Sequence, residues 1–219
     1  MKAMVIRQYG GPEVFEMVEI DKPEPKPGYV LVKVMASSLN PLETKIRSGL
    51  AASLGPALPA ILNADVAGEI VAVGEGVQWQ PGDQVFGCAG GVGTLPGALA
   101  EYMLADARLL ARKPANIDYA TAALFPLVSL TAWEGIMEKS LAQAGEKLLL
   151  HGAAGGVGHI ALQLAKQQGL CTGLSQRRPR RTLPETWGRI MLSWPGRKPL
   201  PVMWTDTPAA RALMPCSTR

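Results

Sequence analysis

The sequence predicts an α/β protein in which a β-rich domain is followed by the first part of a doubly wound, parallel-sheet domain. Short apolar runs bounded by glycine and proline fill residues 1–114 of the 219-residue chain, as is typical of a β-rich domain. After Pro114 the pattern becomes helical, and a buried strand at Lys147–His151 then breaks into a glycine-rich turn and another helical run. This alternation of strand and helix indicates a parallel sheet in a domain that begins near residue 115.

The β-rich part contains five predicted strands and one short helix. Asn40 followed by Pro41 is typical of a helix N-cap and first helical position, and Gly49 marks the end of this helix. Glycine and proline separate the strands, as in the turn Pro81-Gly82-Asp83. The predicted strands are Lys2–Gln8, Val30–Ala36, Val66–Val73, Gln84–Phe86 and Ala100–Leu104.

The glycine-rich turn after Lys147–His151 is the most informative motif of the chain. A dinucleotide pyrophosphate binds where strand, glycine turn and helix follow one another, because the N–H groups at the helix N-terminus are unpaired and the macrodipole there is positive. A side chain at Gly155 would block the phosphates, and Gly158 allows the helix to pack closely. An ordinary tight turn is the alternative. The candidate cofactor-binding residues in the turn are Ala154, Gly155, Gly156, Val157 and Gly158.

The composition argues against membrane, disulfide-rich and metal-binding proteins. The first residues contain no long apolar segment, so we expect neither a signal peptide nor a membrane span. Cys88, Cys171 and Cys216 are widely spaced, which indicates neither a disulfide framework nor a metal-ligand pair. We therefore expect a cytoplasmic protein that has no metal site and does not bind a membrane.

Residues 171–219 differ from the rest of the chain. They contain 9 basic and 2 acidic residues, whereas residues 1–170 contain 13 basic and 16 acidic residues. Helical and strand periodicity is lost, and proline and tryptophan accumulate. We interpret 171–219 as an irregular tail, disordered or translated from a shifted reading frame, with splicing or truncation as alternatives. A basic extension that binds nucleic acid is a further alternative, although no known motif supports it.

Six short motifs, ordered along residues 1–170, carry a family resemblance. They are Asn40–Gly49 (NPLETKIRSG), Asp65–Gly74 (DVAGEIVAVG), Pro81–Val85 (PGDQV), Gly97–Tyr102 (GALAEY), Ser129–Ala132 (SLTA) and the turn Gly152–Gly158. Each motif is weak by itself, but six in the family order are specific. Together they resemble the zinc-free, zeta-crystallin-like quinone oxidoreductases of the medium-chain dehydrogenase/reductase superfamily.

The resemblance implies a fold and an activity. Residues 1–114 are expected to form a GroES-like catalytic domain and residues 115–170 the first part of a Rossmann domain, with NADPH between the two. The family transfers a hydride to a quinone or another activated carbon–carbon double bond, and its full-length members are homodimers. Zinc-dependent relatives have a cysteine shortly before the position of Asn40 and Gly-His-Glu at 63–65. Because this chain has neither, we expect no zinc.

The resemblance also gives roles to single residues. Asn40 matches an asparagine of the substrate cleft whose amide would hydrogen-bond the acceptor carbonyl, although an N-cap role suits the same residue. Glu43, a candidate catalytic residue, stands where the family more often has aspartate. Thr131 matches a threonine near the nicotinamide, and the alternative is a helix threonine bonded back to a carbonyl.

Three functions therefore remain open. The first is an NADPH-dependent reductase of a small quinone or enone that is truncated and weakly active or inactive, because only the first strand–turn–helix unit of the nucleotide domain is recognisable. The second is a non-catalytic remnant that keeps only the β-rich fold. The third, a nucleic-acid binder acting through the basic tail, has the least support.

Overall fold

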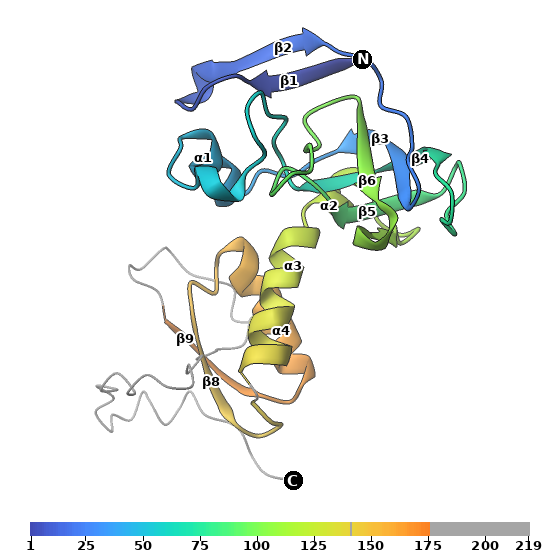
Figure 1. Ribbon diagram of the computed structural model, residues 1–219. Coiled ribbons are helices and arrows are strands. Elements are labelled where there is room, and N and C mark those ends of the chain that lie inside the picture. The colour runs from blue at the N-terminus through green and yellow to red at the C-terminus, as the bar shows by residue number, and fades with distance from the viewer. Residues whose placement is uncertain (141, 176–219) are drawn as a thin grey trace. The chain divides into compact units, whose positions relative to one another are not determined.

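The computed structural model describes residues 1–140 and 142–175, so most of the predicted tail lies outside the described residues. The chain divides into two compact units, one of Met1–Leu127 and one that begins at Val128 (Figure 1). The combination of helices and sheets in these units confirms the predicted α/β class. Among the described residues, no helix is both long enough and apolar enough to cross a membrane.

A five-stranded antiparallel sheet forms the centre of the first unit, with the strand order β6-β3-β4-β5-β7. β3 pairs with β4 on one side and with β6 on the other, where Val32 lies opposite Met103. Four of the predicted strands are therefore observed in this sheet, as β3, β4, β5 and β6, while β7 was not predicted. The strands are β3 (Tyr29–Ala36), β4 (Asp65–Val73), β5 (Gln84–Cys88), β6 (Tyr102–Asp106) and β7 (Leu110–Arg112).

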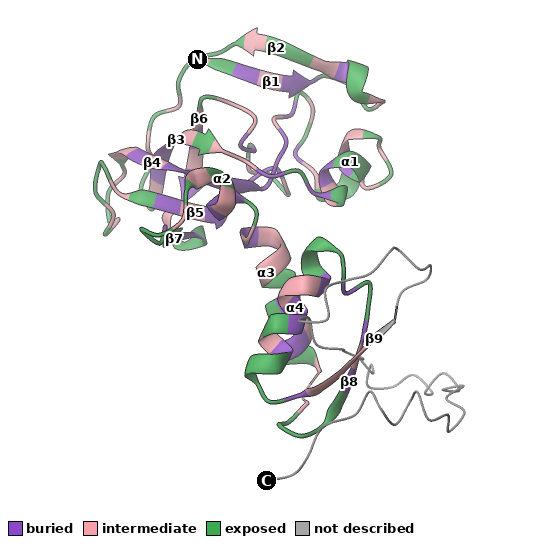
Figure 2. Ribbon diagram, turned by 180° about the vertical axis from the view of Figure 1, so that it is seen from behind, coloured by how far each residue is buried: buried purple, intermediate pink, exposed green. Residues whose placement is uncertain are grey.

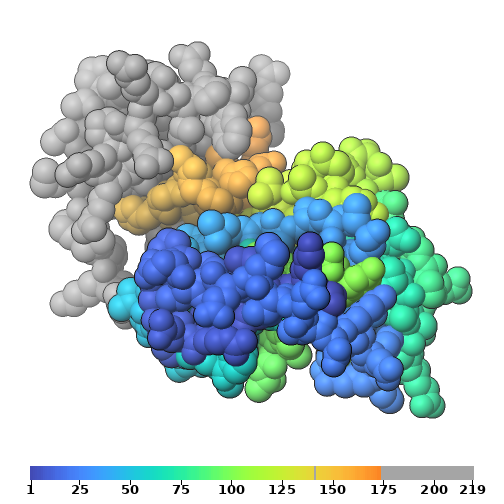
Figure 3. Space-filling model, turned by 90° about the horizontal axis from the view of Figure 1, so that it is seen from above, coloured from blue at the N-terminus to red at the C-terminus, as the bar shows by residue number. Residues whose placement is uncertain are grey.

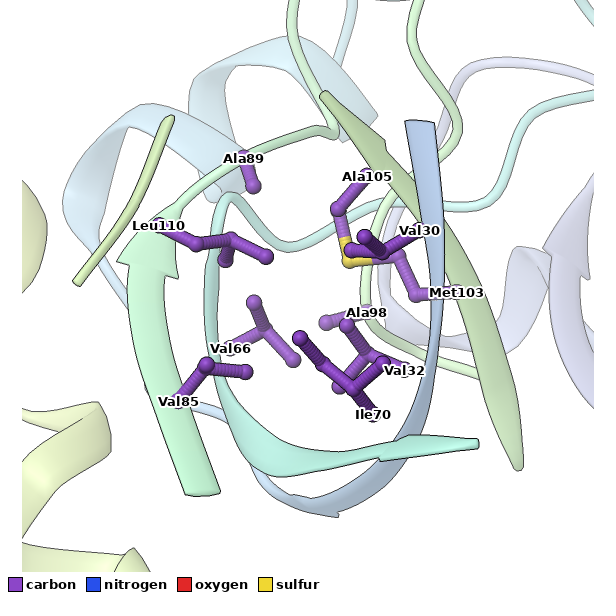
Figure 4. Close-up of a cluster of buried hydrophobic side chains, with 10 residues drawn as sticks. All are labelled: Val30, Val32, Val66, Ile70, Val85, Ala89, Ala98, Met103, Ala105 and Leu110. Atoms are coloured by element: carbon purple, nitrogen blue, oxygen red, sulfur yellow. The ribbon is translucent and has the colours of Figure 1, made fainter. Parts of the chain in front are cut away.

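Apolar side chains from these strands converge on one core, which Figure 4 shows in close-up. Val30 and Val32 enter it from β3, and Leu31 between them is also buried. Since successive side chains of a strand point to opposite faces, both faces of β3 are covered here. The core consists of Val30, Val32, Val66, Ile70, Val85, Ala89, Ala98, Met103, Ala105 and Leu110.

The N-terminal strands β1 (Lys2–Ile6) and β2 (Phe15–Glu19) form an antiparallel hairpin, joined through the short 3-10 helix η1 (Pro12–Val14). Their residues, dark blue in Figure 3, lie at the surface of the first unit. Ala3 of β1 bridges Ala100. This bridge takes Ala100 out of β6, so the strand predicted at Ala100–Leu104 is observed two residues later.

Helix α1 (Pro41–Arg47) confirms the short helix predicted after Asn40. Its Ile46 is 1% exposed and packs in a second core cluster with Ile6 and Leu62. A 3-10 turn, η2 (Ala52–Leu54), follows the helix. The burial of Ile46 therefore fixes α1 against the first unit and positions the residues at its N-terminus.

Helix α2 (Tyr119–Ala123) also belongs to the first unit. Its N-cap, Asp118, accepts the Thr121 N–H at 2.7 Å. Ala122 and Ala123 pack against Ala67 of β4, and their small side chains allow this close contact. The first compact unit consequently extends to Leu127, beyond the boundary predicted at residue 114.

The second unit contains a strand–helix–strand arrangement. β8 (Lys147–His151) and β9 (Cys171–Ser175) are parallel neighbours connected by α4 (Gly156–Gln167). Before them, α3 (Pro126–Trp133) continues into a π-helical segment, η4 (Glu134–Lys139). Figure 2 shows α4 with a buried side and an exposed side. Its buried residues follow the helical spacing, as the sequence predicted: Gly158, Ala161, Leu162 and Ala165.

β9 corrects the expectation that irregular structure begins at residue 171. Leu148 of β8 lies opposite Thr172, and the pairing continues to Ser175. The segment Cys171–Ser175 has no strong apolar alternation of its own, and it forms a strand because a neighbouring strand supplies its hydrogen-bond partners. The prediction of a disordered or frameshifted tail otherwise falls on residues 176–219, outside the described residues.

Candidate functional site

The glycine-rich turn connects β8 to α4 and leaves the first turn of the helix open. Gly152 has a φ of +74°, a conformation that favours glycine, and Gly155 is the N-cap of α4. Residues 154–157 are exposed. Among the described residues, no acceptor binds the backbone N–H groups of 156–158. The turn thus presents three open donors at the positive end of a 12-residue helix.

Close packing explains Gly158. A Cβ at this position would lie 2.3 Å from Gly152 O and 2.5 Å from Ala153 Cα, so only glycine fits. The predicted close approach of α4 is confirmed, although the neighbour is the turn rather than the strand. At Gly155 an added Cβ would meet only Gly152 O, at 3.2 Å. The fold therefore constrains Gly155 much less, and its role in admitting phosphate stays a prediction.

Helix α3 approaches this turn within the second unit. A Cβ at Gly156 would lie 3.2 Å from Cγ1 of Val128, so α3 faces the turn at Val128. Thr131 follows three residues later, and residues three apart are neighbours on one helix face. Thr131 is also exposed. We therefore expect Thr131 to lie on the same side of α3 as Val128, and its contact with the nicotinamide stays a prediction.

Asn40 and Glu43 meet at the start of α1, in the first unit. Asn40 is the N-cap and forms a capping box with Glu43, whose carboxylate accepts the Asn40 N–H. Glu43 Oε1 also accepts the Ala64 N–H at 3.1 Å. Both residues are buried, with exposures of 6% and 3%. The N-cap role considered for Asn40 is confirmed, while contact of either residue with a substrate stays a prediction.

The carboxamide of Asn40 is held by three acceptors. Its Nδ2 lies 2.9 Å from Asp65 Oδ2, 3.0 Å from Ser38 Oγ and 3.3 Å from Glu43 Oε1. Ser38 Oγ donates to the same Asp65 oxygen at 2.5 Å. We call Ser38, Asn40, Glu43 and Asp65 the polar cluster. Ser38 and Asp65 were not among the predicted site residues, and the available signal was a charged residue at the start of a buried strand.

Cys88 lies beside the polar cluster, opposite Asp65 in the pairing of β4 and β5. Burial raises the pKa of the Cys88 thiol to about 11, and the charges of Asp65 and Glu43 add to this effect. The thiol is consequently protonated at neutral pH. Because the thiolate is the nucleophilic form, we expect Cys88 to be a poor nucleophile.

Metal-binding side chains do not cluster in the part of the chain that the structure describes, where no three His, Cys, Asp or Glu residues surround a common point. His159, beside the glycine turn, has its Nδ1 3.0 Å from Gly155 O. The expected absence of zinc remains a prediction.

Comparison with known sequences agrees with this organisation. Residues 26–115 match the alcohol dehydrogenase GroES-like domain family. Human quinone oxidoreductase is 40% identical over 172 residues, which cover 78% of this chain and 51% of that protein. A chloroplastic NADPH-dependent alkenal/one oxidoreductase from Arabidopsis thaliana is 41% identical over 172 residues, which cover 76% of this chain and 44% of that protein.

A solved structure shows the same similarity. The quinone oxidoreductase of Escherichia coli, in complex with NADPH, aligns with a TM-score of 0.70 and 33% identity over 80% of this chain and 52% of that chain. These matches agree with the resemblance that the six motifs predicted. The chain spans about half the length of the curated relatives it matches.

Proposed function

We propose that this chain is an NADPH-dependent reductase of small quinones or conjugated enones, because its aligned part is similar to quinone oxidoreductases of the medium-chain dehydrogenase/reductase superfamily. The observation that carries the proposal is the open glycine turn at the N-terminus of α4. It belongs to the aligned part of a chain whose relatives include a structure in complex with NADPH. The proposal places the protein in the cytoplasm.

In this proposal, residues 154–158 bind the cofactor pyrophosphate. The three open N–H groups of 156–158 donate to phosphate oxygens, and the positive end of the α4 dipole stabilises their charge. Thr131, on the adjoining face of α3, contacts the nicotinamide part of the cofactor. Bound NADPH supplies the hydride that reduces the acceptor.

Within the first unit, we assign the substrate contact to Asn40 and Glu43. The capping box fixes the start of α1, and the polar cluster fixes the Asn40 carboxamide. Since Asn40 Nδ2 already has three acceptors, its main contribution is a rigid wall against which a quinone or enone is oriented. Direct polarisation of the acceptor carbonyl by Asn40 requires one of these bonds to be exchanged.

A second candidate function is a non-catalytic protein that keeps the GroES-like fold. It is favoured by the extent of the alignments, which cover about half of the relatives' length. The two candidates differ in cofactor affinity, because only a reductase needs to bind NADPH. Binding of nucleic acid falls on residues outside the described part of the chain and finds no support in the described site.

NADPH titration of the purified chain, followed by nicotinamide fluorescence, separates these functions. We expect saturable binding by the wild type and none by Gly155→Val, because the added side chain occupies the space where phosphate meets the backbone. Gly135→Ala is the matched control, since a Cβ there meets nothing within 4 Å. Equal binding by the wild type and Gly155→Val would show that the glycine turn does not bind the pyrophosphate. Absence of NADPH binding by the wild type would favour the non-catalytic candidate.

A further inference from the structure

The carboxylate of Asp65 joins three segments of the first unit. Asp65 is fully buried at the start of β4. Its Oδ2 accepts from Ser38 Oγ and Asn40 Nδ2, and its Oδ1 accepts the Leu127 N–H at 2.8 Å. Ser38 and Asn40 precede α1, whereas Leu127 is the second residue of α3. One side chain therefore contacts the loop before α1 and the first turn of α3.

The electrostatics of this carboxylate fit such a role. A buried charge is tolerated only when hydrogen bonds compensate its lost hydration. No basic side chain in the described part of the chain forms an ion pair with Asp65. Its compensation comes instead from the Ser38 and Asn40 donors and from an N–H in the first turn of α3, where the helix end is positive.

We propose that Asp65 is a positioning residue that fixes the Asn40 carboxamide and the start of α3 with the same carboxylate. Each oxygen accepts from a different segment: Oδ2 from the loop before α1, and Oδ1 from the Leu127 N–H. The structural part is independent of any activity. Its consequence for the substrate, a site wall held in place through Asn40, rests on the proposed function.

Backbone and side-chain amide exchange, measured by NMR on the full chain, tests the structural part. Asp65→Ala removes the acceptors of both the Leu127 backbone N–H and the Asn40 side-chain NH2 group. We therefore expect both groups to exchange at least about tenfold faster, as the loss of a hydrogen bond to a charged group predicts. Asp65→Asn keeps an oxygen for Leu127 but turns an NH2 group toward Asn40. In this variant we expect only the Asn40 side-chain NH2 group to exchange faster, while the Leu127 backbone N–H remains protected.

Asp118→Asn is the matched control, because Asp118 also caps a helix and its carboxylate accepts the N–H of Thr121 in its own segment. We expect it to change exchange at α2 alone. Unchanged Leu127 and Asn40 amides in Asp65→Ala would overturn the proposal. If Asp65→Ala does not fold, Asp65→Asn decides, since acceleration of both amides or of neither contradicts the division of tasks.

Steady-state kinetics test the consequence for the substrate. With NADPH and a small quinone, we expect Asp65→Asn to raise the quinone KM about tenfold while the NADPH dissociation constant stays within about twofold, because the glycine turn lies in the second unit. Equal changes in both constants indicate general destabilisation and overturn the positioning role. A wild type that neither binds NADPH nor reduces quinone contradicts the proposed function, and the exchange measurements still decide about Asp65.

Discussion

At the scale of single residues, the polar cluster gives its members partners that local sequence does not reveal. Asn40 and Asp65 are 25 residues apart and share a hydrogen bond of 2.9 Å. Removing one partner of a buried hydrogen bond leaves the other polar group buried without a partner. The effects of substitutions at the two residues on the free energy of unfolding are therefore coupled. The charges of Asp65 and Glu43 in this cluster also add to the effect of burial, which raises the pKa of the neighbouring Cys88.

Cys88 provides a pH test of this environment. With its pKa raised to about 11 from an ordinary value near 9, Cys88 is expected to react with iodoacetamide about a hundredfold more slowly at pH 8 than an exposed thiol. The rate is measured in a Cys171→Ser, Cys216→Ser background, with urea-unfolded protein as the control. A rate that already levels off near pH 9 in the folded protein would contradict the raised pKa.

The same pKa affects stability. Between pH 9 and 11 the unfolded thiol has released its proton while the folded thiol keeps it, so the unfolded state binds fewer protons. We therefore expect the free energy of unfolding to fall as the pH rises above about 9, and Cys88→Ala to lessen this fall. Urea titrations of both proteins across this pH range measure the difference.

At the scale of elements, the position of α4 is fixed by the contact between its first turn and the loop that precedes it. Its buried residues follow the helical period, which the sequence predicted. The distance between Gly158 and the turn backbone, by contrast, is a property of how the helix lies on β8. An open N-terminus and a tightly packed first turn thus occur together at this site.

Gly158→Ala tests this packing. Because the added Cβ would lie 2.3 Å from a backbone oxygen, we expect the free energy of unfolding to fall by about 1–3 kcal/mol, as for other overpacked sites. Gly135→Ala, whose Cβ has open space, is expected to be neutral or slightly stabilising. Urea unfolding measures both variants, and an equal response from the two would show that α4 moves freely away from the turn.

At the scale of the whole molecule, the main feature is that the family relationship covers about half of each curated relative. The described residues contain one strand–helix–strand crossover of the nucleotide-binding architecture, with β8 and β9 as its strands. A dinucleotide site in this architecture is built from two such halves. We therefore expect pyrophosphate binding and full catalytic competence to be separable in this chain.

Enzyme assays test whether this chain can bind the cofactor and yet be a poor catalyst. We expect quinone reduction by the 219-residue chain to be orders of magnitude slower than by full-length human quinone oxidoreductase, of which it aligns with 51%. Hydride transfer needs the nicotinamide carbon within about 3–3.5 Å of the acceptor, and that positioning uses both halves of the nucleotide site. Parallel steady-state assays with NADPH and a small quinone measure both rates, and comparable rates would contradict this expectation.

The sequence by itself determined the features that depend on local patterns. Apolar alternation and glycine or proline breaks predicted β3, β4 and β5, the Asn40-Pro41 cap predicted α1, and the glycine turn predicted the start of α4. Such signals arise from the backbone preferences of neighbouring residues, so they need no knowledge of the fold. The six ordered motifs were sufficient to predict the similarity to quinone oxidoreductases.

Only the tertiary structure decided the rest. β9 is a strand because β8 supplies its partners, although its own residues carry a weak pattern. Compact packing extends to Leu127 because alanines of α2 fit against β4. The carboxylate of Asp65 bonds both Asn40 and Leu127 because folding brought together residues 25 to 62 positions apart, a proximity that no local pattern encodes.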